Sequence, residues 1–132
     1  MKVLMDANVA FDVYERRQPH YAASQQVCRL AQRGALAAAV ASHTVANGLY
    51  IYGKPFAEFV KRRLTEDFKI CCADAHLTRA CLALGIRDLE DALQTGAAMS
   101  WKAAFIITRN ERDFKASAIP AISPSAFLKR FH

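Results

Sequence analysis

Apolar residues along the chain follow two patterns, short continuous runs and longer stretches in which they recur every three or four positions. Continuous runs predict strands, and the helical spacing predicts amphipathic helices. The predicted strands occupy residues 2–5, 36–41, 68–73, 104–107 and 119–122. The predicted helices occupy residues 9–14, 23–34, 42–50, 56–64, 74–85, 88–101 and 123–128. Because strands alternate with helices, the pattern predicts an α/β sandwich with a largely parallel sheet.

Several residues predict where these elements begin or how they are placed. Ser42 or Thr44 is expected to cap the helix that follows the second strand, and Asp74 to cap the helix after the third. Residues 68–73 form a compact apolar run, which predicts a buried strand. Residues 119–122 are expected to form a last edge strand despite Pro120, and Pro124 suits the first position of a terminal helix.

The composition is that of an ordinary globular protein, with 132 residues of which 53% are hydrophobic and 23% charged. This length predicts a single domain over residues 1–132. The apolar runs are shorter than a membrane span, and Asp6 interrupts the first of them where a secretory signal would continue. We therefore expect a cytoplasmic protein. The net charge of +6 favours an anionic partner, which can be nucleic acid, a membrane surface or an acidic protein.

Acidic residues lie at places where an α/β sheet binds ligands, beyond the carboxyl ends of its strands. Asp6 directly follows the first strand, Asp91 lies at the start of a helix, and Asp113 comes shortly after the fourth strand. Taken singly, such acids are more often helix caps or first-turn residues. If the three converge, however, their mutual repulsion requires a hard divalent cation such as Mg²⁺ or Mn²⁺. The reaction typical of such a cluster is phosphodiester hydrolysis by a metal-activated water.

Three segments strengthen this hypothesis, because in order and spacing they resemble the sequence blocks of PIN-domain proteins. They are Val3–Val9, Asp88–Gln94 and Phe105–Phe114, and residues 119–124 resemble the closing strand and helix of bacterial members. The resemblance implies a three-layer α/β/α sandwich whose mainly parallel sheet has about five strands. Most characterised members are Mg²⁺- or Mn²⁺-dependent ribonucleases, and small bacterial members resemble the toxins of type II toxin–antitoxin pairs.

The resemblance also implies roles for particular residues. Asp6, Asp91 and Asp113 match the catalytic, metal-binding acids of the family. Residues that would assist these acids, by orienting them or by replacing further family acids, are Asn8, Asn47, Asp88, Thr108 and Asn110. Asn110 stands where many relatives have Asp, and Asn47 where a Glu is common; Asp88 or Asp12 can supply the missing charge.

The expected function is therefore a metal-dependent endoribonuclease, with three alternatives left open. Neutral residues at 47 and 110 are compatible with a catalytically attenuated module that binds RNA or a protein partner. A phosphatase or a DNA nuclease with the same metal chemistry is also compatible. Arg109 and Arg112 bracket Asn110, so they are the candidate RNA-binding residues.

The expected partners are RNA and an antitoxin, without a membrane. The segment from Tyr50 to Leu64 carries more aromatic residues than a solvated helix needs, which is compatible with a homodimer.

Overall fold

Five parallel strands form a sheet at the centre of the chain, in the order β3-β2-β1-β4-β5. The computed structural model describes residues 1–131, without the side chains of residues 64 and 65. The strands are β1 (Lys2–Met5), β2 (Ala37–Ala41), β3 (Phe68–Cys71), β4 (Phe105–Ile107) and β5 (Ala121–Ile122). β1 is the central strand, and its Leu4 pairs with Ala39 of β2 and Ile106 of β4. The predicted α/β fold with a five-stranded parallel sheet is confirmed.

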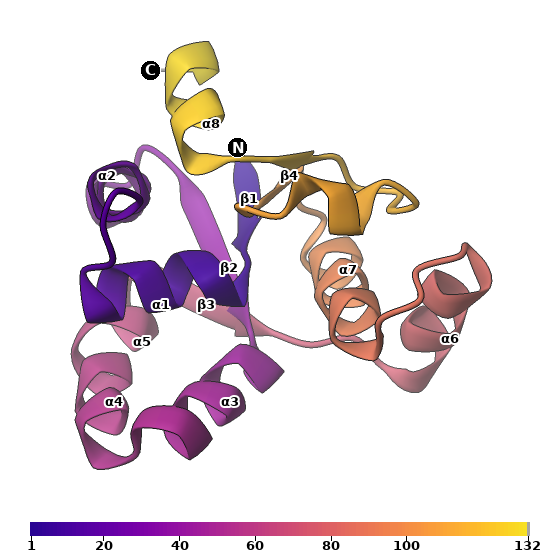
Figure 1. Cartoon of the computed structure of the whole chain (residues 1–132), viewed down its shortest axis with the longest axis horizontal. Helices are drawn as coiled ribbons and strands as arrows, with labels where there is room; N and C mark the ends of the chain where they lie inside the picture. The colour runs from indigo at the N-terminus through magenta and orange to yellow at the C-terminus, as the bar shows by residue number, and fades with distance from the viewer. Residues whose placement is uncertain (132) are drawn as a thin grey trace.

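Helices flank the sheet (Figure 1), with α1 to α5 on one side and α6 and α7 on the other. They are α1 (Ala7–Glu15), α2 (Tyr21–Gln32), α3 (Ser42–Tyr52), α4 (Lys54–Phe59), α5 (Thr65–Asp67), α6 (Ala75–Ala83), α7 (Leu89–Trp101) and α8 (Pro124–Phe131). A π-helical turn over Val60–Leu64 joins α4 to α5, and a 3-10 turn over Glu111–Phe114 follows β4. In the part of the chain that the structure describes, each helix is too short or too polar to cross a membrane.

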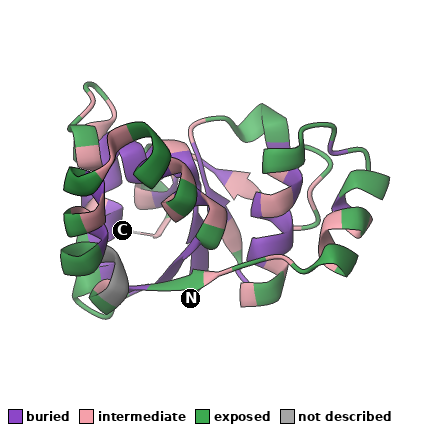
Figure 2. Cartoon of the chain, turned by 90° about the horizontal axis from the view of Figure 1, so that it is seen from below, coloured by how far each residue is buried: buried purple, intermediate pink, exposed green. Residues whose placement is uncertain are grey.

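The alternation of side chains along β1 divides the core between the two faces of the sheet. Val3 and Met5 belong to the larger apolar cluster, which includes Val27 of α2 and Phe56 of α4. Leu4 points the other way and packs with alanines of α7. Figure 2 shows buried residues concentrated in the centre of the sheet, between the exposed outer surfaces of the helices, and the central strands β1, β2 and β4 are buried over most of their length. Because a strand buried on both faces carries no polar alternation, its sequence reads as a continuous apolar run.

Two local expectations were wrong. The N-cap of α3 is Ala41, without a side-chain capping bond, rather than Ser42 or Thr44. β2 leads into α3 with no intervening residue, and the Thr44 hydroxyl instead accepts a hydrogen bond from Gln94 of α7 at 3.0 Å. The strand near residue 68 is an edge strand that ends at Cys71, and its Ile70 is exposed, because β3 pairs only with β2.

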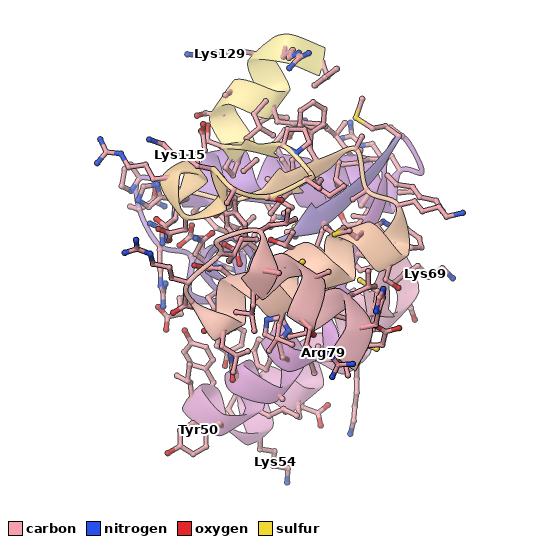
Figure 3. The ribbon with its side chains drawn as sticks, turned by 90° about the vertical axis from the view of Figure 1, so that its right-hand side faces the viewer. Tyr50, Lys54, Lys69, Arg79, Lys115 and Lys129 are labelled. Atoms are coloured by element: carbon pink, nitrogen blue, oxygen red, sulfur yellow. The ribbon has the colours of Figure 1, made fainter. Side chains whose placement is uncertain are left out.

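The aromatic residues of α3 and α4 mostly face inward, which corrects the impression of an exposed aromatic surface. Phe56 is completely buried, and rings that pack around it come from Phe11, Tyr14, Tyr52 and Phe59. Tyr50 is the exception, being 92% exposed and projecting from α3 into solvent (Figure 3). The predicted apolar position Leu64 lies outside the described side chains.

Gly48 permits the close approach of α3 to Phe56. A Cβ at this position would lie 2.0 Å from the Phe56 ring. We expect Gly48→Ala to lower the free energy of unfolding by about 1–3 kcal/mol, because overpacking displaces a ring that the surrounding aromatic residues hold in place. Urea unfolding measures this change.

A double-mutant cycle with Phe56→Leu isolates the cause. The smaller side chain removes the clashing ring atoms, so adding Gly48→Ala to Phe56→Leu should cost much less than adding it to wild type. An equal cost in the two backgrounds would contradict the proposed steric contact.

Candidate active site

Asp6 is the first residue after β1 and is held by both neighbouring elements. Its carboxylate accepts a hydrogen bond from the Ala7 N–H at 2.8 Å, which makes it the N-cap of α1. The second carboxylate oxygen accepts from the Thr108 hydroxyl at 2.7 Å. Because β1 and β4 are adjacent and parallel, the residues that follow them, Asp6 and Thr108, lie side by side. Asp6 therefore caps α1 and also lies at the end of β1, and it is only 6% exposed.

Asn8 and Thr108 connect Asp6 to the loop after β4. The Asn8 side-chain amide donates to Asp6 Oδ2 and Thr108 Oγ1, each at 3.3 Å, while its oxygen accepts from the Arg109 N–H. The Asn110 N–H donates to Thr108 Oγ1 at 3.0 Å. The structure thus brings Asn8 and Thr108 against Asp6 as expected, and Asn110 joins this network through its backbone.

Asp91 lies in the first turn of α7, which Asp88 caps. Asp88 Oδ1 accepts from the Asp91 N–H at 3.1 Å, so Asp88 has the capping role that the sequence allowed. Asp91 is half-buried, whereas Asp113 is exposed within the 3-10 turn after β4. Asp6 follows β1 and Asp113 lies in the turn after β4, whereas Asp91 opens α7 and lines the same surface cavity as Asp113.

The charges of these acids act on one another. Burial raises the pKa of Asp91 to about 7, and the charges of Asp88, Asp113 and Asp6 add to this effect. Burial also raises the pKa of Asp6, although its hydrogen bonds from Thr108 and Ala7 oppose the shift. The carboxylates of the proposed site are therefore close enough to repel one another.

Glu90 also belongs to this group of acids, although no role for it is predicted from the sequence. Its charge raises the pKa of both Asp6 and Asp91, and it also acts on His43 of α3, whose pKa is lowered by burial. The signal available in the sequence was its position beside Asp91 in the segment that opens α7. Exposed first-turn glutamates are common for reasons of helix stability alone, so this signal is weak.

Two surface cavities meet at the loop after β4. One, of about 270 Å³, is lined by residues that include Asp88, Asp91, Arg112, Asp113 and Lys115. Lys115 projects outward from this region (Figure 3). The other, of about 530 Å³, is lined by residues 109–113. Carboxylates and basic side chains therefore share one surface, as a site for a metal cation and a phosphate requires.

Arg109, a candidate for RNA binding, forms an ion pair with Asp12. Its Nε donates to Asp12 Oδ2 at 2.6 Å and its Nη2 donates to Oδ1 at 3.1 Å, a bidentate arrangement. The Asp12 side chain is completely buried. Asp12 therefore neutralises Arg109 and does not supply a missing charge to the acids. Arg112 is exposed.

Asn47 is the predicted residue that the structure does not connect to the others. It is half-buried in α3, and among the described residues it has no hydrogen bond or charge interaction with the three acids. His43, one turn earlier, is influenced by the charge of Glu90.

The oxygen donors of this site suit Mg²⁺ or Mn²⁺, which prefer carboxylates. Within the described residues, no three His, Cys, Asp or Glu side chains are grouped closely enough to hold a metal ion by themselves. Mg²⁺ usually binds proteins through one or two carboxylates, and water and substrate phosphate complete its shell. The arrangement fits this mode rather than a closed protein cage.

Comparisons with known proteins agree with this architecture. The family model described as PIN domain matches residues 2–112. A structure of VapBC2 from Rickettsia felis, bound to a DNA fragment from their promoter, contains a chain similar in fold, with a TM-score of 0.67 and 16% identity. That match covers 93% of this chain and 98% of the other.

A structure of FitAB bound to an IR36 DNA fragment is also similar, with a TM-score of 0.60 and 17% identity over 92% of this chain and 94% of that one. At these identities the likeness concerns the fold. A comparison with curated proteins gives no significant match.

The raised pKa of Asp91 predicts a pH-dependent stability. Its value is about 7 in the folded protein and 3.8 in a free chain, so the folded protein binds more protons between about pH 4 and pH 7. The stability contributed by this group is therefore lost as the pH rises through that window. In metal-free buffer, Asp91→Asn should gain stability relative to wild type as the pH rises from about 4 to about 7.

Urea unfolding across this pH range measures the difference, and ¹³C NMR of the Asp91 carboxyl measures its titration directly. Asp74→Asn is the matched control, because Asp74 caps α6 at an exposed position and Asn caps equally well. A carboxyl of Asp91 that titrates near pH 4 would contradict the described burial and repulsion.

Proposed function

The chain belongs to the PIN-domain family, and we propose that it is a Mg²⁺- or Mn²⁺-dependent endoribonuclease with Asp6, Asp91 and Asp113 as its metal-binding catalytic acids. The observation that carries this proposal is that Asp91 and Asp113 line one surface cavity, where burial first, and repulsion by the charges of Asp88, Asp113 and Asp6 second, raise the pKa of Asp91 to about 7. A divalent cation offsets such repulsion and is itself bound more tightly because of it. Strongly shifted pKa values of this kind cluster at functional sites.

In this proposal the chain's own side chains have distinct tasks. Thr108 and the Ala7 N–H fix the Asp6 carboxylate, so that its orientation does not depend on the ligand. Arg112 and Lys115 line the same cavity as Asp91 and Asp113, and they would bind phosphate oxygens of the substrate. When bound, the metal would supply Lewis acidity at the scissile phosphate and activate the attacking water.

A second candidate is a PIN-fold module that has lost most of its catalysis and binds RNA or a protein partner. Two observations favour it. Positions 47 and 110 hold neutral amides, and the described acids do not by themselves form a three-ligand metal group. Fewer carboxylates weaken metal binding, since an amide oxygen adds no net charge.

The wider proposal is a cytoplasmic toxin of a type II toxin–antitoxin pair. It rests on the family, on the small size of the chain, and on the fold that it shares with chains in the VapBC2 and FitAB structures. The partners proposed are an RNA substrate, an antitoxin protein and, through the exposed face of α3 around Tyr50, a second copy of the chain.

Cleavage of a labelled single-stranded RNA tests the nuclease directly. We expect wild-type protein to cleave with Mn²⁺ or Mg²⁺ and to stop with EDTA. Asp6→Asn and Asp91→Asn should each lower the rate by about 100-fold or more, because changes that merely misorient metal ligands already cost about 10–100-fold.

Asp6→Asn and Asp91→Asn guard against a contaminating nuclease, whose activity would survive in both. Asp74→Asn controls for the loss of one negative charge, since it should cleave like wild type. Equal activity in wild type, Asp6→Asn and Asp91→Asn would reject the proposed site. Substrates of DNA and of a small phosphoester, tested beside RNA, separate the ribonuclease from a DNA nuclease or a phosphatase.

Restoring acids at positions 47 and 110 tests the attenuated alternative. If the natural site is weakened by its amides, Asn47→Glu and Asn110→Asp should lower the Mn²⁺ concentration needed for half-maximal cleavage by roughly tenfold. For a fully competent site we expect no such gain. Isothermal titration with Mn²⁺ gives the same comparison without relying on cleavage, and Glu66→Gln serves as an exposed charge control.

A further inference from the structure

A buried polar pair joins α3 to α7 beside the proposed active site. The Gln94 side-chain amide donates to the Thr44 hydroxyl at 3.0 Å, and both side chains are completely buried. Gln94 Oε1 has no hydrogen-bond partner among the described residues. Neither residue has a role in the proposed metal chemistry, and neither lines the cavity that contains Asp91.

The buried amide of Gln94 is not explained by stability. Burial removes the amide from water, and its Oε1 then lacks the hydrogen bond that water would have supplied. Replacing a buried polar pair by apolar groups of the same shape can leave stability unchanged or raise it. A hydrogen bond differs from apolar packing in being directional, so this pair can fix how α7 is turned relative to α3.

Gln94 lies one turn after Asp91, whose position the sheet does not set directly. Asp6 follows β1 and Asp113 lies in the turn after β4, so the pairing of these strands helps to place both acids. Asp91 instead belongs to the first turn of α7, and residues three or four apart lie on one face of a helix. A rotation of α7 at Gln94 would therefore move Asp91 as well.

Neighbouring residues of α7 limit its other movements. The Thr95 hydroxyl donates to the Asp91 carbonyl oxygen at 2.9 Å, which joins the first two turns of the helix to each other. A Cβ at Gly96 would lie 2.5 Å from Ala73 Cβ, so α7 closely approaches the segment after β3. Packing at Gly96 limits the distance of the helix from that segment, whereas a directional bond limits its rotation.

Thr44 is an acceptor that the sheet itself holds in place. α3 begins directly after β2, so Thr44 is only three residues beyond the end of a central strand. His43, the residue before it, is influenced by the charge of Glu90, which lies four residues before Gln94. Glu90 and Gln94 therefore share one face of α7, and that face is turned towards the start of α3.

We propose that Gln94 is a positioning residue of the active site, which through its bond to Thr44 fixes the rotation of α7 and so holds Asp91 beside Asp113. Loss of this bond lets the first turns of α7 rotate, and the two carboxylates then no longer line one cavity as they do in the intact protein. The binding of a metal by Asp91 rests on the proposed function, whereas the positioning of its helix does not.

The first test measures the orientation of α7 without metal. Residual dipolar couplings of backbone N–H groups, recorded in EDTA, report the direction of each bond within the protein. We expect Gln94→Met and Thr44→Val to change the couplings of residues 89–92 and to leave those of β1 and β2 unchanged. Thr44→Ser keeps the hydroxyl and should keep the wild-type couplings. Unchanged couplings in both Gln94→Met and Thr44→Val would overturn the proposal.

The second test measures Mn²⁺ affinity by isothermal titration, without substrate. Gln94→Met and Thr44→Val should each weaken Mn²⁺ binding about tenfold, because residues that orient metal ligands typically contribute about 10–100-fold to affinity. The double variant should bind no more weakly than either single variant, since both changes remove the same hydrogen bond. Thr44→Ser is the matched control and should bind Mn²⁺ like wild type.

Urea unfolding of the same variants separates positioning from stability. Gln94→Met removes the half-satisfied amide, so its urea midpoint should not fall, whereas Thr44→Val leaves the amide unpartnered and should lower the midpoint. Should Thr44→Val fail to fold, the double variant takes its place. A lower midpoint with wild-type Mn²⁺ affinity in both Gln94→Met and Thr44→Val would show a purely structural pair and would reject the positioning role.

Val27→Ala controls for a general loss of stability. Val27 belongs to the core on the opposite face of the sheet from α7, so its truncation should lower the urea midpoint and leave Mn²⁺ affinity unchanged.

The two tests also separate this proposal from the proposed function. Wild-type protein that binds no Mn²⁺ would reject the metal site, and the dipolar couplings would still decide whether Gln94 positions α7. Metal-dependent cleavage by wild type, together with unchanged Mn²⁺ affinity in Gln94→Met and Thr44→Val, would reject the positioning role and leave the nuclease standing.

Discussion

The buried carboxylate of Asp6 is the constraint on which the site depends. A charge at the end of a central, apolar strand is tolerated only when hydrogen bonds replace its water. Two of the donors, the Ala7 N–H and the Thr108 hydroxyl, come from α1 and from the end of β4. Thr108 and Asn8 then hold the backbone of the following loop. The requirement to solvate one charge therefore fixes the position of the segment that carries Arg112 and Asp113.

The ion pair between Asp12 and Arg109 reinforces this arrangement from a second direction. Its bidentate geometry joins α1 to the same loop, and the burial of Asp12 makes the pair difficult to break. Asp6 and Asp12 both lie on the first helical segment and have opposite uses. The Asp6 carboxylate lies beside other acids, whereas the Asp12 carboxylate is neutralised by the Arg109 guanidinium. A position in the sequence does not distinguish these uses, because the partner of each is about a hundred residues away.

This separation explains what the sequence could and could not predict. The order of strands and helices could be predicted from the hydrophobic pattern. A central strand such as β1 is buried on both faces, so it is visible in the sequence as a continuous apolar run. The exposed edge position of β3 was missed because Phe68 and Ile70 have the same apolar character as residues of a central strand. The cap of α3 was missed because Thr44 has a partner in α7. The grouping of Asp6, Asp91 and Asp113 was predicted from a rule about strand ends and from family resemblance, whereas the effect of the Glu90 charge on Asp6 and Asp91 depends on how the chain folds.

The pairing of β1 with β4 also determines when the site around Asp6 can form during synthesis of the chain. The hydrogen bond between Asp6 and Thr108 spans 102 residues, and the sheet that supports it is entirely parallel. Chains emerge from the ribosome N-terminus first, so Asp6 lacks its hydrogen bond from Thr108 until that residue has also been made. A partly made chain therefore has no assembled carboxylate site. For a nuclease that acts on RNA, this topology would keep the nascent protein inert beside the very message and ribosome that are producing it.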